Sequence, residues 1–466
     1  MSEPGRSTNG RIGLFVEDLL GRYPAATPYL TCRHTLTHGE LRATVAAEIG
    51  LFAGLGIGSG TTVALQMPPS FVQVEVLLAL WRLGAQVMLI DHRFKPAEVA
   101  TLLAMCRPQY TVRAGSASRS PLAFVERCEV VTEVRGDGRL AATDARLVQF
   151  SSGSTGVPKA VGRNVESLAA EVQRFARVEG MPGAGDRALL LSSTAHSFGL
   201  IGGLLHALSA GTEVVFTPRM SAPDILHTAA DRAVAVIFGV PFHFDLLSAA
   251  SHPARLPRLR AAVSGGEQLP ARVAARFAAR FGVAVGQSYG TTETGVIAMD
   301  VSGSTTAVGP PLVGIDLRVR EGELEVRLDR SPYLLPEVEH RFVDGWFRTR
   351  DRATLDTDGL VHLNGRGDSL VIVGGLKVDL TEVEAVLRNH PQVVDAVLVR
   401  GDAIEAYVAT GSSELSAADV IAWCRERLAD YKLPRLVRVM AALPRTATGK
   451  LVRERSTLRA AALASA

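Results

Sequence analysis

The densest group of chemically useful side chains in this chain of 466 residues is a nine-residue loop, Ser151–Lys159. The loop holds two glycines, four hydroxyl side chains and one lysine. Glycines let backbone N–H groups approach an anion, hydroxyl groups add donors, and the lysine adds a compact positive charge. The spacing is not that of a Walker loop, and a proline precedes the lysine. The pattern indicates a triphosphate-binding loop; the alternative is a flexible surface turn rich in Ser and Gly.

A second segment, Gln287–Glu293, combines an aromatic ring with a carboxylate. Tyr289 offers a flat face on which a base could stack, and Glu293 offers the hard oxygen that Mg²⁺ prefers. Taken alone, the segment is equally typical of a turn with a helix N-cap.

Lysine is rare in this chain, which has five lysines and 45 arginines. The two side chains are not equivalent, because arginine is a planar fork and lysine is a compact point charge. A lysine that remains against such a bias is therefore a candidate for a chemical role. The five are Lys95, Lys159, Lys377, Lys432 and Lys450.

The overall composition excludes several classes of protein. A net charge of +3 argues against a dedicated nucleic-acid binder. No run of 18 apolar residues predicts a membrane span, and the polar start, Met1–Arg11, lacks the apolar core of a signal peptide. The four cysteines, Cys32, Cys106, Cys128 and Cys424, are scattered, which favours a cytoplasmic location over a disulfide or zinc framework.

The elements that must position these residues follow an α/β pattern. Thr62–Gln66 is predicted to be a strand, Phe71–Leu83 a helix and Gln86–Ile90 a second strand, which is the grammar of a parallel sheet. Leu147–Phe150 is the strand before the phosphate loop. The same pattern predicts a helix over Gly199–Ser209 and strands over Arg187–Ser192, Glu213–Phe216, Val234–Phe238, Ala261–Val263 and Val283–Gly286.

After about residue 300, apolar and polar residues alternate as in antiparallel strands. We expect a small β-barrel-like part there, followed by a small α+β domain that starts near Asp368. The predicted domains are therefore residues 1–367 and 368–466. The elements expected in this half are strands over Leu317–Arg320, Glu323–Arg327, Leu360–Leu363, Ser369–Val373, Val393–Val399 and Ala403–Ala409, with helices over Leu380–Asn389 and Ala417–Ala429.

The phosphate loop resembles the Ser/Thr-Gly-Ser/Thr-Thr-Gly-x-Pro-Lys signature of the acyl-adenylate-forming superfamily. That superfamily includes acyl-CoA synthetases, carrier-protein-loading adenylation domains and luciferases. Four more segments resemble its motifs in the same order: Gln287–Glu293, Gly345–Asp351, Asn364–Asp368 and Pro444–Lys450. Five motifs in order, over about 300 residues, make an accidental match improbable.

The resemblance implies that ATP and Mg²⁺ are cofactors. It implies that Tyr289 stacks on adenine, Thr292 contacts the α-phosphate and Glu293 binds the metal. Asp351 would accept both ribose hydroxyls, since a carboxylate can take two donors; Arg350 stands where the family usually has glycine. The rest of the implied nucleotide site is Ser151, Ser152, Gly153, Ser154, Thr155, Gly156, Lys159, Gly266, Glu267, Gly290 and Arg366.

The resemblance also implies a mobile C-terminal domain that serves two steps. Lys450 would be catalytic, because a positive group placed at developing charge is typically worth about 10²- to 10³-fold in rate. Asp368 would be the hinge of the domain. Gly375 and Lys377 would face the site when a thiol attacks the adenylate.

The acid pocket is predicted from a segment where members of the superfamily differ. Relatives that activate amino acids tend to place an aspartate near His196, to pair the α-amine. With histidine here, we expect an aryl or acyl acid without an α-amino group, although His196 could be structural. The same resemblance places Val240, Gly265 and Gly295 in the pocket, where Gly265 and Gly266 are expected to leave room for bulk.

The predicted function is ATP-dependent activation of a small carboxylic acid to acyl-AMP, with release of pyrophosphate, followed by transfer to a thiol. The thiol belongs to coenzyme A or to the phosphopantetheine arm of an acyl carrier protein. The ten basic and three acidic residues of Ile421–Arg459 would attract either acceptor. The alternatives are an enzyme that stops at the adenylate or activates another oxyanion, and a catalytically silent nucleotide- or partner-binding protein.

Overall fold

The computed structural model describes residues 6–94, 96–115, 124–151, 159–251, 255–335, 341–366, 370–373, 376–428, 430–446 and 449–465. The chain divides into two compact units. The first unit is Met1–Asp316 with Val326–Phe347, and the second is Leu317–Glu325 with Arg348–Ala466. Compactness thus groups residues 348–366 with the C-terminal part. The predicted division at Asp368 concerns a hinge outside the described residues, and it stays a prediction.

The first sheet of the first unit confirms the predicted β-α-β pattern. Its strands β3, β4, β5 and β7 run parallel, and the edge strands β6 and β8 run antiparallel to their neighbours. In spatial order the strands are β6 (Val130–Val134), β5 (Tyr110–Ala114), β3 (Thr62–Gln66), β4 (Gln86–Leu89), β7 (Leu147–Ser151) and β8 (Lys159–Arg163).

The second sheet of the first unit has eight strands. Those from β13 to β1 are parallel, and β14 and β2 are antiparallel edges. Their order is β14 (Gly295–Asp300), β13 (Val285–Thr291), β12 (Ala261–Gly265), β11 (Val236–Gly239), β9 (Arg187–Leu190), β10 (Glu213–Val215), β1 (Pro28–Thr31) and β2 (Thr35–Thr37).

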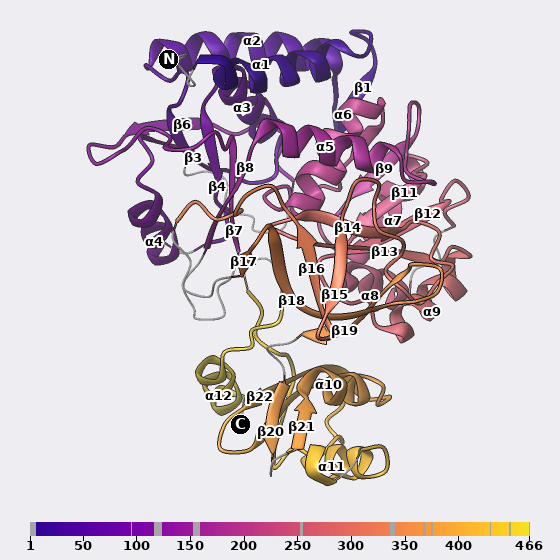
Figure 1. The fold of residues 1–466 in the computed structure, drawn as a ribbon. Helices are drawn as coiled ribbons and strands as arrows, with labels where there is room; N and C mark the ends of the chain where they lie inside the picture. The colour runs from indigo at the N-terminus through magenta and orange to yellow at the C-terminus, as the bar shows by residue number, and fades with distance from the viewer. Residues whose placement is uncertain are drawn as a thin grey trace. The chain divides into compact units, whose positions relative to one another are not determined.

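Helices separate and cover the two sheets. The main core joins residues of both sheets, such as Leu65 and Leu190, to helices α1, α2, α3 and α5, so these helices pack between the sheets. The outer face of the first sheet meets α4, and that of the second meets α7, α8 and α9. The bounds of the helices, several of which Figure 1 labels, are α1 (Arg6–Gly21), α2 (His38–Gly54), α3 (Phe71–Arg82), α4 (Pro96–Cys106), α5 (Val165–Ala176), α7 (Ala222–Asp231), α8 (Pro241–Ala249) and α9 (Ala271–Phe281).

The helix predicted over Gly199–Ser209 is irregular. It is a π-helix, η1 (Phe198–Leu205), followed by a short α-helix, α6 (His206–Ala210). Its glycines pack closely: a Cβ on Gly202 would meet the ring of Phe175. π-Helices are rare and often lie at functional sites, and this one directly follows the loop that carries His196.

The second unit begins with antiparallel strands, as predicted. Strand β18 (Trp346–Leu355) pairs antiparallel with β19 (Val361–Arg366). In this pairing Asp351 lies opposite Arg366. Strands β15 (Leu317–Arg320) and β16 (Glu323–Arg327) precede them in the chain, as does β17 (Phe342–Val343), which the division into units assigns to the first unit.

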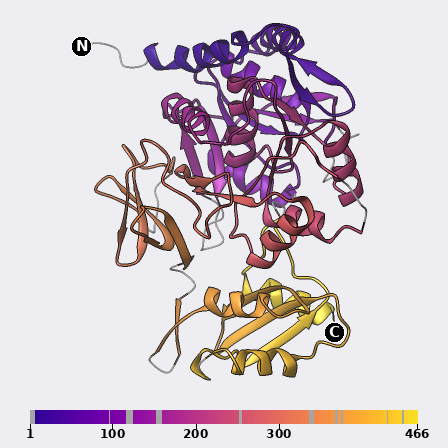
Figure 2. The same ribbon diagram turned by 90° about the vertical axis from the view of Figure 1, so that its right-hand side faces the viewer.

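The C-terminal part of the second unit confirms the predicted α+β arrangement. Its three-stranded sheet buries one face against α10 and α11 and the other against α12, so helices flank it on both sides (Figure 2). No helix among the described residues has the length and apolar character needed to cross a bilayer. The elements are β20 (Leu370–Val373), β21 (Leu376–Asp379), α10 (Leu380–Arg388), β22 (Val393–Arg400), β23 (Ile404–Thr410), α11 (Ala417–Arg425), the 3-10 turn η3 (Asp430–Lys432), β24 (Leu436–Met440) and α12 (Arg455–Ala464).

Candidate active site

The predicted phosphate loop connects the two strands of an antiparallel hairpin. Ser151 ends β7 and lies opposite Lys159, the first residue of β8. The ladder therefore fixes both ends of the loop at the carboxyl end of the parallel strand β7, which is the edge where α/β sheets bind ligands. The residues between them, Ser152, Gly153, Ser154, Thr155 and Gly156 included, lie outside the described part of the chain.

Glu293 joins this hairpin to the second sheet. It lies in the turn between β13 and β14 and is buried. Its Oε1 accepts hydrogen bonds from the Ser151 hydroxyl at 3.1 Å and the Tyr333 hydroxyl at 2.9 Å, and an Arg341 nitrogen lies 3.5 Å away. Two residues that the sequence assigned to nucleotide and metal, 142 positions apart, are thus in direct contact.

Tyr333 is a member of this cluster that the sequence motifs missed. Residues 332–334 run beside β8: the Leu334 N–H donates to the Ala160 carbonyl at 3.0 Å. This pairing places the Tyr333 ring centroid 5.4 Å from Lys159 Nζ while its hydroxyl donates to Glu293. A tyrosine between a proline and a leucine lies in no motif and follows no periodicity, so no signal in the sequence marked it.

The donors around Glu293 suit Mg²⁺ bound together with a nucleotide. Among the described residues, no three Asp, Glu, His or Cys side chains gather to form a metal cage. Mg²⁺ usually takes one or two carboxylates and fills its octahedron with phosphate oxygens and water. A single buried carboxylate next to a hydroxyl and a phosphate loop fits that mode.

The turn that carries Thr292 and Glu293 is held at both ends. The Thr294 N–H donates to the Thr291 hydroxyl at 3.2 Å, and the two hydroxyls lie 3.1 Å apart. Thr292 is partly exposed at the tip, where it could reach a phosphate. Tyr289 and Gly290 lie on β13; Tyr289 is only 8% exposed, so most of its ring is covered by protein.

Gly295 has a packing reason to be glycine. Its φ is +71°, and a Cβ would run into the carboxylate of Glu171. That buried carboxylate accepts the Val296 N–H at 3.0 Å and pairs with Arg163 of β8 at 2.7 Å. The pair links the end of the phosphate hairpin to the start of β14. The predicted place of Gly295 in the acid pocket stays a prediction.

The loop that carries His196 is anchored to the first sheet. Gln149 of β7 donates to the Ala195 carbonyl at 2.7 Å and accepts from the Ser197 hydroxyl at 2.6 Å. These bonds bracket His196, whose Nε2 lies 3.7 Å from the Asp91 carboxylate. The histidine side chain remains 38% exposed, so it can still contact a ligand.

Asp91 is a buried carboxylate that the sequence did not single out. Arg93 binds it through two nitrogens, at 2.9 and 2.7 Å. Although burial acts to raise it, the hydrogen bonds from Arg93, together with the nearby His196 imidazole, hold the pKa of Asp91 well below its usual range. The charge is therefore already paired within the protein, and it is a poor counter-ion for a substrate ammonium.

The space expected beside Gly265 is filled by an aromatic ring. A Cβ on Gly265 would lie 3.0 Å from the Phe198 ring, so this ring occupies the space next to the glycine, and the expected room for a bulky acid stays a prediction. Gly266 has a φ of +86°, and a Cβ there would meet only Val240, at 3.8 Å. Gly266 and Glu267 are both exposed. Phe198, the first residue of η1, thus packs against Gly265, a contact that no local pattern in the sequence indicated.

Val240 is fixed by a neighbouring histidine. Its N–H donates to His243 Nδ1 at 3.1 Å at the start of α8. Burial, with a smaller effect of Arg93, lowers the pKa of His243 to about 4. His243 is therefore neutral at pH 7 and can accept this bond.

In the second unit, Arg350 occupies a left-handed position, with φ at +63°. This conformation favours glycine, which explains why a glycine is expected there. The Arg350 N–H donates to Glu323 at 2.8 Å, and the next residue, Asp351, is buried with its N–H bonded to the Thr349 hydroxyl. The N–H groups of residues 350 and 351 are thus both hydrogen-bonded with arginine at this left-handed position.

The other predicted residues of the second unit are described in part. The backbone of Arg366 pairs opposite Asp351, and Lys377 lies on β21, but their side chains are not described. Lys450 is exposed. The predicted hinge Asp368 and Gly375 lie outside the described residues.

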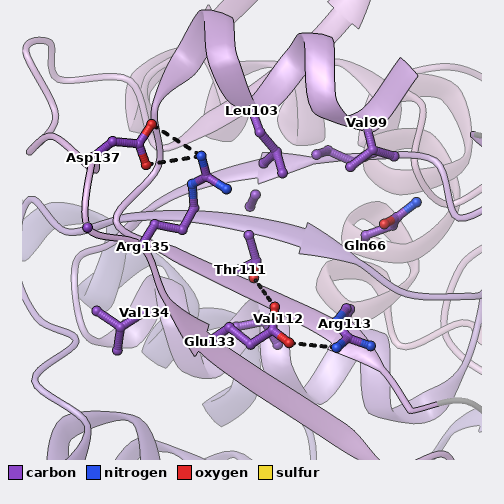
Figure 3. Close-up of a pocket in the computed structure, with 13 residues that line it drawn as sticks. Gln66, Val99, Leu103, Thr111, Val112, Arg113, Glu133, Val134, Arg135 and Asp137 are labelled. Atoms are coloured by element: carbon purple, nitrogen blue, oxygen red, sulfur yellow. Dashed lines mark hydrogen bonds and ion pairs between the residues drawn. The ribbon is translucent and has the colours of Figure 1, made fainter. Parts of the chain in front are cut away.

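A pocket of about 430 Å³ lies elsewhere in the first unit, between β3, β5, β6 and α4 (Figure 3). Apolar residues such as Val99 and Leu103 form its walls. The charged residues at its rim form ion pairs with one another. Arg113 bonds Glu133 at 2.6 Å, and Arg135 lies 3.0 Å from Asp137. None of the predicted site residues is among those that line it.

Comparison with known proteins identifies the family. Residues 17–330 match the AMP-binding enzyme family, and residues 382–450 match the AMP-binding enzyme C-terminal domain. The chain belongs to the AMP-binding enzyme family. This confirms the predicted class, a ligase that uses ATP to activate an acid.

Similar proteins include several acid–CoA ligases. The 2-succinylbenzoate–CoA ligase of Bacillus licheniformis is 28% identical over 91% of this chain and 94% of its own length. A feruloyl-CoA synthase from an Amycolatopsis species is 28% identical over 93% and 97%. The crystal structure of the anthranilate CoA ligase AuaEII with anthranoyl-AMP, 24% identical, superposes with a TM-score of 0.81 over 96% of this chain and 97% of that one, which confirms the fold.

Proposed function

We propose that this enzyme is an acid–CoA ligase for an aryl or acyl acid that lacks an α-amino group. The observation that carries the proposal is the contact set Lys159–Tyr333–Glu293–Ser151, which assembles a cation, a carboxylate and a hydroxyl at the ends of the phosphate loop. Such a set suits the β- and γ-phosphates of ATP. The ligases named above support the acid and the thiol.

The first step forms the adenylate. A carboxylate oxygen of the acid attacks the α-phosphorus of ATP, a new P–O bond forms, and the bond to pyrophosphate breaks. The phosphate loop with Lys159 orients the leaving pyrophosphate, Thr292 contacts the α-phosphate, and Tyr289 holds adenine. Lys450 offsets the charge that develops where the two anions meet. Catalysis is then chiefly positioning and electrostatics.

Two further side chains are proposed to bind the metal and the ribose of the nucleotide. Glu293 would hold Mg²⁺, which when bound would neutralise charge on the pyrophosphate. Asp351 would bind the ribose hydroxyls, with Arg366 nearby on the paired strand.

The second step forms the thioester. We propose that the C-terminal domain turns at Asp368, so that Lys450 withdraws and the segment with Gly375 and Lys377 approaches. The sulfur of the thiol attacks the acyl carbon, its proton is lost, and AMP leaves. Because the relatives named above are CoA ligases, CoA is the favoured acceptor. A phosphopantetheine arm on an acyl carrier protein is the second candidate, and the basic stretch Ile421–Arg459 would attract either.

The acid pocket favours an uncharged or aryl tail. Asp91 is already paired with Arg93, and the Phe198 ring stands over Gly265. An ammonium would find no available counter-ion at Asp91, whereas a flat apolar acid would find an aromatic wall. We also propose a cytoplasmic location, which the four free thiols support.

The test is pyrophosphate release with a panel of acids. The panel contains aryl acids, medium-chain fatty acids and α-amino acids, and hydroxylamine traps any adenylate. We expect release with aryl or acyl acids, and continuous turnover after CoA is added. Release without turnover on CoA or a phosphopantetheinylated carrier would indicate an adenylate-only enzyme. ATP binding without any release would indicate the silent alternative, and either result would overturn the proposal.

A further inference from the structure

Lys450 lies on a short, exposed hairpin of the second unit. Arg445 and Leu451 pair across it, and the Thr446 N–H donates to the Lys450 carbonyl at 2.7 Å. Gly449 turns the chain with a φ of +88°. Leu451 packs one arm of the hairpin against the core beside α12, and polar contacts on both sides of Lys450 add to this anchor.

The arm before Lys450 is tied down by Arg445. One guanidinium nitrogen donates to the Gly449 carbonyl at 2.6 Å, next to Lys450, and the other to Asp395 at 2.7 Å. Asp395 lies on β22 and its side chain is only 17% exposed. Arg445 therefore bridges the turn of the hairpin to the central sheet of the domain.

The arm after Lys450 is tied down by Arg453. Its two terminal nitrogens bind the two oxygens of Glu384 at 2.6 and 2.7 Å. Glu384 is fully buried and also accepts the Leu398 N–H at 2.8 Å. Arg388 completes the network, since it bonds Glu384 and Asp395, both at 3.0 Å.

We propose that Asp395, Arg445, Glu384 and Arg453 form a clamp that positions Lys450 for adenylation. The inference rests on the proposed function and adds residues to which no role is otherwise assigned. A fork-shaped guanidinium can hold two acceptors in fixed geometry, which lysine cannot. A cation must be placed closely to stabilise a transition state, because a misplacement of about 1 Å can cost about 100-fold.

The test uses Arg445→Ala, because this side chain is a third exposed and its loss should leave the domain folded. We expect adenylation, followed as pyrophosphate release, to fall about 10-fold through kcat, with little change in the KM for ATP or acid. Thioester formation from supplied acyl-AMP should keep its rate, because Lys450 has no part in it. Asp395→Asn should act in the same direction, and Arg445→Lys should restore part of the loss.

The matched control is Glu405→Gln. Glu405 is another buried acid of this unit that binds two arginines, Arg455 and Arg459, and both of these lie on α12 and not on the hairpin. The substitution should lower stability without a selective effect on adenylation. Equal losses in both half-reactions for Arg445→Ala, or no loss in either, would overturn the clamp. A wild-type enzyme that releases no pyrophosphate with any acid would instead overturn the proposed function.

Discussion

At the scale of single residues, the two lysines proposed to act on ATP have different surroundings. Lys159 lies beside the Tyr333 ring and ends the phosphate loop, whereas Lys450 stands exposed on a clamped hairpin. Lysine gives each site a compact positive charge: Lys159 is proposed to act on the pyrophosphate, and Lys450 on the charge that develops at the α-phosphate. Lys95 lies outside the described residues, and the structure gives Lys432 no specific role.

Lys450→Ala should remove the mobile cation of the first step. We expect adenylation to fall by at least about 100-fold, because a positive group at developing charge is lost. Hydrolysis or thiolation of supplied acyl-AMP should remain close to wild type. Arg438→Ala, which removes another exposed cation of the same domain, is the control. A parallel loss of both half-reactions would argue against separate roles for the domain in the two steps.

His196→Asp should place a second carboxylate close to Asp91, which lies 3.7 Å from the histidine nitrogen. The two like charges would repel each other and any approaching carboxylate, so the KM for the acid should rise about 10-fold while the KM for ATP stays constant. His196→Asn, of similar size but uncharged, separates charge from shape. An unchanged KM for the acid in both variants would assign His196 a structural role.

At the scale of elements, buried carboxylates fasten the segments that carry chemistry. Glu171 links β8 to β14 near Glu293, and Glu384 holds the hairpin of Lys450. Glu405 does the same for α12, through Arg455 and Arg459. In each case an ion pair adds to the packing of the segment; α12, for example, also buries Leu458 against the sheet.

The attachment of α12 should depend on acid pH. Hydrogen bonds from Arg455, with a smaller contribution from Arg459, lower the pKa of Glu405 to about 2 against the effect of burial. A lowered folded-state pKa means that the stabilisation is present above the unfolded pKa of about 4.3 and is lost as pH falls towards about 2.

Glu405→Gln removes this titration, so the variant should be less stable than wild type at neutral pH. Its free energy of unfolding should also fall less steeply in acid. Urea unfolding at a series of pH values between about 6 and 3 measures both effects. If the curves of the wild type and of the Glu405→Gln variant ran parallel through this range, the ionised Glu405 would not be what holds the helix.

At the scale of the whole molecule, the chain forms two compact units, and the proposed residues divide between them. Ser151, Lys159, Glu293 and His196 belong to the first unit, and Asp351 and Lys450 belong to the second. The proposed first step needs Lys450 and the second needs Gly375 and Lys377, which is why a hinge at Asp368, ahead of all three in the chain, is part of the proposal.

Asp368→Pro should restrict that hinge, because proline fixes φ near −65°. We expect one half-reaction to keep most of its rate while the other, and the overall reaction, fall by about 10- to 100-fold. Asp368→Ala removes the carboxylate but leaves the backbone free, so it serves as the control. Wild-type rates for both half-reactions in the proline variant would place the hinge elsewhere.

The sequence by itself determined the order of the elements and the segments with chemistry. Strand β3 was predicted with its observed bounds, and the phosphate loop was placed after β7, because apolar periodicity and Gly/Ser clusters are local signals. The motifs likewise identified Lys159, Glu293 and Lys450 as candidates. These features depend on residues that are close in the chain.

Only the tertiary structure decided which distant residues meet. Tyr333 reaches Glu293 across 40 positions, Arg445 reaches Asp395 across 50, and Phe198 fills the space over Gly265. Such contacts depend on strand pairing and on how helices pack between sheets, which no local pattern specifies. The chemistry was therefore readable from the chain, whereas the contacts that hold each group in place arise from packing between remote segments.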